Sequence, residues 1–141
     1  MNDTVVDSSV VAKWVLAEPD STQAQRLITD IAGAGQRLIV LDLVFPEVAN
    51  AIWKRLRQRQ ITLTQAEDSL KDLAQSPVHI EPALRLLEPA LKIAAQYDRA
   101  IYDALFVALA ADLGVKGVTA DEPLHNTVRN DFQQIVLLRD W

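Results

Sequence analysis

The chain has 141 residues, of which 50% are hydrophobic and 23% charged, with few glycines and prolines, so it is a folded globular protein rather than a disordered one. It has no cysteine and only two histidines, which excludes disulfide frameworks, thiolate metal sites and cysteine nucleophiles and argues against a histidine-rich zinc site. The net charge of −5 disfavours non-specific binding to a nucleic-acid backbone but suits a cation site made of carboxylates.

The amino-terminal segment has no basic stretch ahead of an apolar one, so no secretory signal is visible. The longest apolar stretches are well short of the ~20 residues that span a bilayer. We see no internal repeat, linker or low-complexity segment. A single domain over residues 1–141, located in the cytoplasm, is therefore expected.

Short apolar runs alternate with helical patterns along the chain. The runs predicted as strands are Thr4–Val6, Arg37–Leu41, Val78–Ile80, Gly117–Thr119 and Ile135–Leu138. The helical patterns cover residues 10–16, 21–33, 44–59, 64–75, 82–97, 103–113 and 123–129. This alternation predicts an α/β domain with a short, mainly parallel sheet of about four or five strands flanked by helices.

Local signals set some of the helix boundaries. Thr64 is predicted to be a helix cap, and Glu67 three residues later completes a capping box. Pro89 is predicted to kink or divide the helix over residues 82–97. Gly114 is predicted to end the apolar helix before it.

Two acids follow predicted strands. Asp7 ends the first strand, and Asp121 lies just past the strand over residues 117–119. Ligands of an open parallel sheet bind outside the carboxyl ends of its strands, so both acids fall on the binding edge. Each acid alone is also explained as the N-cap of the helix after it. Ser8 or Ser9 is predicted to cap the helix after Asp7, which frees Asp7 for a site.

Two further acids stand near predicted helix starts. Glu47 lies in the first turn of the helix over residues 44–59, where a carboxylate suits the macrodipole. Asp103 opens an apolar helix either as its N-cap or as a member of a polar cleft, and Asp98 is a competing acid nearby. Each acid has an adequate structural explanation by itself, but four acids at one end of a sheet would repel one another.

A divalent cation would relieve this repulsion. No Lys or Arg lies within two positions of Asp7 or Asp121 to neutralise them. Mg²⁺ or Mn²⁺ typically binds about one to three carboxylates together with waters. Such an ion activates water and neutralises developing charge during phosphodiester hydrolysis. The four acids therefore predict a Mg²⁺ or Mn²⁺ site suited to that reaction.

Four segments together resemble a known family. VVDSSVVAKWVL, FPEVANAIW, AIYDALFVALA and VTADEPL are similar to the four signature segments of PIN-domain proteins, in order and at similar separations. The small form is most similar to the VapC-type ribonuclease toxins of toxin–antitoxin pairs. The resemblance implies a three-layer α/β/α fold and cleavage of RNA with Mg²⁺ or Mn²⁺.

The resemblance also implies roles for individual residues. Asp7, Asp103 and Asp121 would hold the metal directly or through water, and Glu47 would orient a water or serve as general base. Either Asp121 or its neighbour Glu122 could be the acid of this pair that faces the ion. The residues implied to lie beside the metal are Ser8, Ser9, Asn50 and Thr119. The implied partners are an RNA substrate, a small cognate antitoxin and a second copy of the chain.

Positive side chains follow two of these acids. Lys13 lies shortly after Asp7, and Lys54 and Arg55 begin a cluster of four positive residues past Glu47. One interpretation is a solvated helix end, where cations suit the dipole. Another is a strip that guides RNA phosphates, and a third is pairing with an acidic partner segment.

Other Mg²⁺-binding α/β domains fit less well. A phosphate-accepting receiver would have paired acids near the first strand and a Lys after a late strand. A haloacid-dehalogenase-like phosphatase would have a second Asp where Ser9 stands. Two alternatives stay open: a non-catalytic PIN-like domain that binds a partner, and an RNA-processing nuclease outside a toxin–antitoxin pair.

Overall fold

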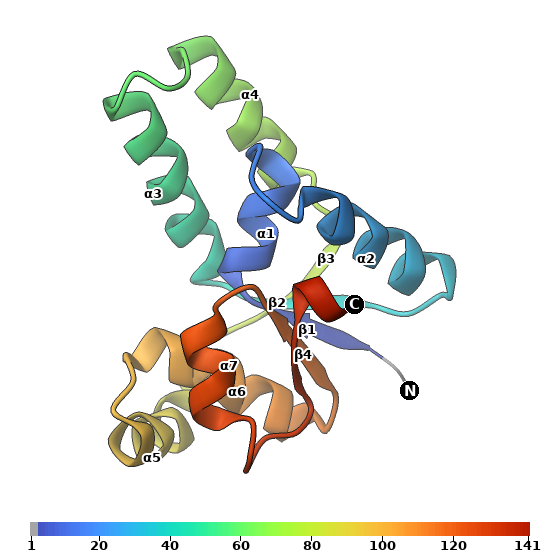
Figure 1. The fold of residues 1–141 in the computed structure, drawn as a ribbon, viewed down its shortest axis with the longest axis vertical. Coiled ribbons are helices and arrows are strands. Elements are labelled where there is room, and N and C mark those ends of the chain that lie inside the picture. Colours follow the sequence, from blue (N-terminus) through green and yellow to red (C-terminus); the bar gives the residue numbers. More distant parts are fainter. Residues whose placement is uncertain (1–2) are drawn as a thin grey trace.

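Five parallel strands form one sheet in the computed structural model, which describes residues 3–141 (Figure 1). The order across the sheet is β3-β2-β1-β4-β5, and every pair of neighbouring strands is parallel. The strands are β1 (Thr4–Val6), β2 (Leu38–Leu41), β3 (Val78–Glu81), β4 (Lys116–Thr119) and β5 (Ile135–Leu137). The five predicted strands and the parallel α/β fold class are thus confirmed.

Helices cover both faces of the sheet (Figure 1). They are α1 (Ser8–Val15), α2 (Ser21–Gly33), α3 (Val44–Arg57), α4 (Leu63–Ala74), α5 (Leu87–Tyr97), α6 (Ile101–Leu113) and α7 (Glu122–Val128). The chain runs from β1 outward to β3, then crosses back to β4 and β5. Because such crossovers are right-handed, α1 to α4 lie on one side of the sheet and α5 to α7 on the other.

The change of direction falls between β1 and β4, which lie side by side in the middle of the sheet. The segments that leave these two strands go to opposite faces and open a crevice at the carboxyl ends of the strands. The backbone N–H of Asp7 donates to the carbonyl oxygen of Val118 at 3.0 Å. Pairing of β1 with β4 therefore continues up to the residue at which the crevice begins.

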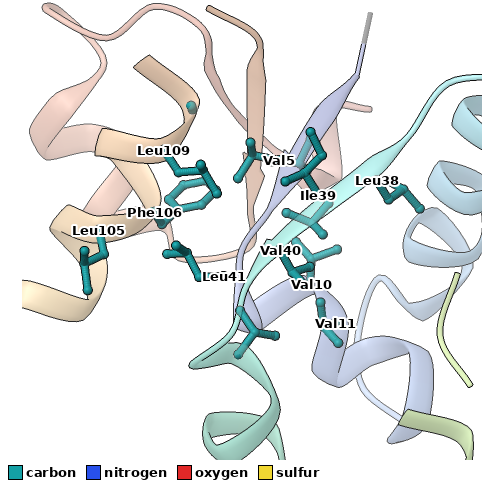
Figure 2. Close-up of a cluster of buried hydrophobic side chains, with 14 of the residues drawn as sticks. Val5, Val10, Val11, Leu38, Ile39, Val40, Leu41, Leu105, Phe106 and Leu109 are labelled. Carbon is teal, nitrogen blue, oxygen red and sulfur yellow. The ribbon is translucent and has the colours of Figure 1, made fainter. Parts of the chain in front are cut away.

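Apolar side chains pack against both faces of the central strands. Val5 of β1 and Ile39 of β2 are each 1% exposed. Figure 2 shows Val10 of α1 on one side of these strands and Phe106 and Leu109 of α6 on the other. Strands buried on both faces are continuous apolar runs, which is why they were recognisable in the sequence.

Helix α6 is buried almost all round. Every residue from Ala104 to Ala110 is buried, and α6 packs on β1 and β4. Asp103 lies just before this stretch, in the first turn of the helix. The packing of α6 therefore fixes where the carboxylate of Asp103 stands.

The prediction that Ser8 or Ser9 caps α1 is wrong. Asp7 is the N-cap, with extended backbone angles (φ −82°, ψ 159°), and its Oδ1 accepts the backbone N–H of Ser8 at 2.8 Å. β1 ends at Val6 and α1 begins at Ser8, so Asp7 is the one extended residue between strand and helix. Asp7 consequently caps the helix and faces the crevice at the same time.

The capping box predicted at Thr64 and Glu67 is wrong by two residues. The hydroxyl of Thr62 accepts the N–H of Gln65 at 3.1 Å, and the side chain of Gln65 accepts the N–H of Thr62 at 2.9 Å. Both positions carry a Thr followed three residues later by a long polar side chain. Because α4 begins at Leu63, Thr62 is its N-cap and Gln65 completes the capping box.

The helix predicted over residues 82–97 is divided. A 3₁₀ turn (Leu84–Leu86) precedes α5, and Pro89 lies in the first turn of α5, where a missing N–H costs nothing. Gly114 ends α6 in the left-handed conformation (φ +65°), as predicted. Within residues 3–141, no helix combines the length and the hydropathy of a membrane span.

Gly117 marks a close approach between β4 and its neighbours. A Cβ at Gly117 would lie 2.8 Å from Cδ1 of Ile135, 3.0 Å from Cζ of Phe106 and 3.2 Å from Cβ of Ala110. We expect Gly117→Ala to lower the free energy of unfolding by about 1–3 kcal/mol, because overpacking pushes α6 off the sheet. Urea denaturation measures this difference.

Gly33 at the end of α2 is the matched control, since a Cβ there meets nothing within 4 Å. Gly33→Ala is expected to be neutral or to stabilise the fold by about 0.5 kcal/mol. Equal stability of Gly117→Ala and wild type would contradict the close packing of α6 on β4.

Candidate active site

The carboxylate of Asp7 is held by hydroxyl groups from both sides of the crevice. Its Oδ2 accepts a hydrogen bond from Oγ1 of Thr119 at 2.8 Å and another from Oγ of Ser9 at 3.0 Å. Thr119 is the last residue of β4 and is fully buried. These bonds join the start of α1 to the end of β4 and leave Asp7 in one orientation.

The same two hydroxyls also bind the backbone of the turn after β4. Oγ of Ser9 accepts the N–H of Ala120 at 3.0 Å, and Oγ1 of Thr119 accepts the N–H of Asp121 at 3.1 Å. Each hydroxyl therefore donates to Asp7 and accepts from the turn. This arrangement fixes the positions of Asp7 and Asp121 relative to each other.

Asp121 and Asp103 reach the crevice from two different helices. Asp121 is the N-cap of α7, and its Oδ1 accepts the N–H of Leu124 at 3.0 Å. Asp103 is not a cap, because α6 begins at Ile101 with Ala100 as its N-cap. Of the two explanations left open for Asp103, the structure supports membership of a polar cleft.

An arginine that the sequence analysis did not single out lies between these acids. Nη2 of Arg99 is 2.9 Å from Oδ2 of Asp103 and 3.6 Å from Oδ2 of Asp121. The available signal was the spacing of Arg99 four residues before Asp103, which pairs side chains on a helical turn. Its contact with Asp121 depends on the fold and has no signal in the sequence.

The four predicted acids line one pocket. Its volume is about 350 Å³. Glu47 lies in the first turn of α3, and the amino ends of α1 and α3 meet beside the end of β1 (Figure 1). The pocket is lined by Asp7, Glu47, Asp103 and Asp121, together with Ser8, Ser9, Ala12, Lys13, Glu18, Val48, Ala51 and Ala120. A larger hollow of about 550 Å³ lies at the opposite, amino ends of the strands and holds none of the four acids.

Charge and burial perturb the acids of this pocket. Burial raises the pKa of Asp7 above its ordinary value, against the opposing effect of hydrogen bonds from Thr119, Ser9 and Ser8. The pKa of Glu47 is raised to about 7, first by burial and then by the negative charges of Asp7 and Asp103. The pocket therefore carries negative charge that Arg99 does not fully neutralise.

Several predicted accessory residues lie elsewhere. Asn50 and Lys54 are exposed on α3 and do not line the pocket. Glu122 points to Arg139, with an N–O distance of 2.8 Å, so Asp121 is the acid of that pair that faces the pocket. Asp98 ends α5 as its C-cap in the left-handed conformation and is also outside the pocket.

The two remaining positive residues are bound to the loop between α1 and α2. Nζ of Lys13 donates to the carbonyl oxygen of Pro19 at 2.8 Å and lies 3.6 Å from Glu18. Arg55 donates to Glu18 at 3.0 Å and to the carbonyl oxygen of Ala17 at 3.0 Å. Both cations are thus engaged beside the rim of the pocket.

The donors of the pocket suit a hard divalent ion. They are carboxylate and hydroxyl oxygens, and the pKa of Glu47 is raised first by burial and then by the negative charges of Asp7 and Asp103. Over residues 3–141, no group of three or more acidic or histidine side chains lies close enough together to bind a metal ion without rearrangement. The donor chemistry therefore fits a metal. Arg99 forms ion pairs with two of the acids, Asp103 and Asp121.

The raised pKa of Glu47 predicts a pH dependence of stability in the presence of a chelator. Between the ordinary pKa of 4.5 and the folded value of about 7, the folded chain keeps a proton that the unfolded chain has lost. The free energy of unfolding therefore falls as the pH rises through this window. Glu47→Gln should gain about 1–2 kcal/mol over wild type between about pH 5 and pH 8, allowing for partial exposure.

Urea denaturation at both pH values measures this difference. Glu67→Gln, an exposed acid on α4, is the matched control and should follow the wild-type profile. Parallel profiles for wild type and Glu47→Gln would contradict the raised pKa.

Comparisons with known proteins identify the family of the chain. Residues 4–130 match the model of the PIN domain. The chain is 33% identical over 122 residues to ribonuclease VapC3 of Pyrobaculum aerophilum, a match that covers 85% of this chain and 90% of VapC3.

Solved structures share the fold. PAE2754 of Pyrobaculum aerophilum superposes with a TM-score of 0.75 at 20% identity, over 99% of this chain and 85% of that one. VapC20 of Mycobacterium tuberculosis, a toxin that cleaves the sarcin–ricin loop, superposes with a TM-score of 0.66 at 17% identity, over 92% of this chain and 96% of its own. With the family model matching nearly the whole chain, this protein belongs to the PIN-domain family.

Proposed function

We propose that this protein is a Mg²⁺- or Mn²⁺-dependent endoribonuclease that acts as the toxin of a type II toxin–antitoxin pair. The observation that carries the proposal is the meeting of Asp7, Glu47, Asp103 and Asp121 in one pocket at the carboxyl ends of the strands. The name of its relative VapC3, a ribonuclease, supports RNA as the substrate.

Asp7, Asp103 and Asp121 are the residues that would hold the ion. When bound, the ion supplies an activated water and neutralises the charge that develops on the phosphate. Thr119 and Ser9 orient the carboxylate of Asp7, because their hydroxyls occupy its Oδ2. Rigid orientation of a ligand oxygen favours metal binding, since less freedom is lost on binding.

Glu47 is the proposed general base. Its pKa of about 7 in the ion-free pocket lies near neutral pH, where a proton acceptor is most effective. Its place at the start of α3 puts it across the pocket from the turn after β4. In this role it takes the proton of the attacking water.

The RNA backbone is proposed to follow the positive end of α3. Lys54, Arg57 and Arg59 are exposed there, whereas Lys13 and Arg55 contact Glu18. Exposed cations in the second half of the helix that carries Glu47, and just past its end, would attract RNA phosphates in spite of the net negative charge.

The toxin assignment brings partners with it. A small antitoxin, a second copy of the chain and a cytoplasmic location are parts of this proposal, and they follow from the toxin assignment, which the relation to ribonuclease VapC3 supports. A processing nuclease would show the same metal-dependent cleavage without a neighbouring antitoxin gene. A non-catalytic domain would show no cleavage at all.

Cleavage of RNA by the purified chain tests the proposal. We expect activity with Mg²⁺ or Mn²⁺ that is lost in chelator, and losses of about 10²-fold or more in Asp7→Asn and Asp103→Asn, because each removes a charge from the ion's ligands. Asp112→Asn is the matched control on α6: it is exposed, pairs with Arg85 and is remote from the pocket.

Asp112→Asn should retain activity within about twofold of wild type, which excludes a general effect of losing one acid from α6. Cleavage that persists in chelator and is equal in wild type, Asp7→Asn and Asp103→Asn would show that the assignment of these acids to the active site is wrong.

A further inference from the structure

Arg99 forms ion pairs with two acids of the pocket, Asp103 and Asp121. Within residues 3–141, the other cations that pair with an acid of the pocket are Lys13 and Arg55, and both pair with Glu18. Arg99 lies in the short link between α5 and α6, four residues before Asp103. Its side chain is only 22% exposed, and the guanidinium stands 2.9 Å from Asp103 and 3.6 Å from Asp121. These two acids come from different helices, since Asp103 lies in α6 and Asp121 caps α7.

The guanidinium is held in an incomplete way. Both ion pairs use the same nitrogen, Nη2, rather than the two-pronged contact that arginine usually makes with a carboxylate. Nε of Arg99 is buried and has no hydrogen-bond partner among residues 3–141. A buried donor without a partner costs free energy. The ion pairs with Asp103 and Asp121 must offset this cost, so these two acids keep the guanidinium in place.

The position of Arg99 conflicts with a bound divalent ion. Oδ2 of Asp103 and Oδ2 of Asp121 face the positive charge of Arg99. An ion that binds these carboxylates would lie close to the guanidinium, and the two positive charges repel. Filling the pocket with metal therefore weakens or displaces the contacts of Arg99.

We propose that Arg99 is a positioning residue that holds Asp103 and Asp121 together in the metal-free pocket and competes with the divalent ion for both carboxylates. It thereby lowers the affinity for the metal and stabilises the pocket when no metal is present. This inference rests on the metal site proposed above.

Calorimetric titration of the RNA-free protein with Mn²⁺ tests the competition directly. We expect Arg99→Gln to bind Mn²⁺ about three- to tenfold more tightly than wild type, because one repelling charge is gone. Arg99→Lys keeps the charge and should stay within about twofold of wild type. Arg99→Met, which keeps the apolar stem, is the second neutral variant and should also bind more tightly.

Arg85→Gln is the matched control. Arg85 pairs with Asp112 at 2.8 Å near the far end of α6, so the variant loses an ion pair of the same kind and the same unit of charge. Nine residues of helix separate Asp112 from Asp103, about 13 Å, which exceeds the Debye length of about 8 Å at physiological salt. Mn²⁺ affinity of Arg85→Gln should stay within about twofold of wild type.

Thermal unfolding gives a second readout that needs no activity. In chelator, Arg99→Gln should unfold at a lower temperature than Arg85→Gln, and saturating Mn²⁺ should raise its Tm by more than it raises that of wild type. Unchanged or weaker Mn²⁺ binding by both neutral variants would overturn the role of Arg99 while leaving the metal site intact. Absence of Mn²⁺ binding by wild type would overturn the metal site and this inference together.

Discussion

The hydrogen bonds that Asp7 accepts from Thr119 and Ser9 are the interaction on which the pocket depends. They join the ends of β1 and β4 at the place where the sheet changes direction, so they close a contact between segments 112 residues apart. Since the same hydroxyls bind the turn that carries Asp121, one small cluster sets the position of two acids. A parallel sheet makes this possible because all its strands end at the same edge.

The pocket concentrates negative charge at a cost in stability. Burial and neighbouring acids raise the pKa of Glu47, and burial raises that of Asp7. Arg99 offsets part of this charge through Asp103 and Asp121. The surrounding core bears the remainder: α6 is buried nearly all round, and Gly117 lets it approach β4 closely enough to hold the acid at its start. Functional sites commonly hold such unfavourable charge on rigid scaffolds.

The sequence predicted the fold well because its strongest patterns are the ones that packing also requires. Strands buried on both faces are apolar throughout, and Gly114 is a helix stop whose left-handed conformation suits glycine. The errors fell at helix starts. At α4, two neighbouring capping patterns compete, and the helix uses the earlier one, at Thr62 and Gln65. At Asp7, capping and facing the pocket were treated as alternatives, whereas a carboxylate with two oxygens does both.

For the pocket, the sequence by itself determined which acids can meet, because strand ends and helix starts of a parallel α/β fold share one edge. It also showed that no Lys or Arg lies within two positions of Asp7 or Asp121 to neutralise them. Only the tertiary structure decided that Arg99 reaches Asp121 as well as Asp103, that Arg139 takes Glu122 away from the pocket, and that Asn50 faces solvent. These outcomes depend on side-chain directions and on contacts between distant segments, and neither is encoded in local spacing.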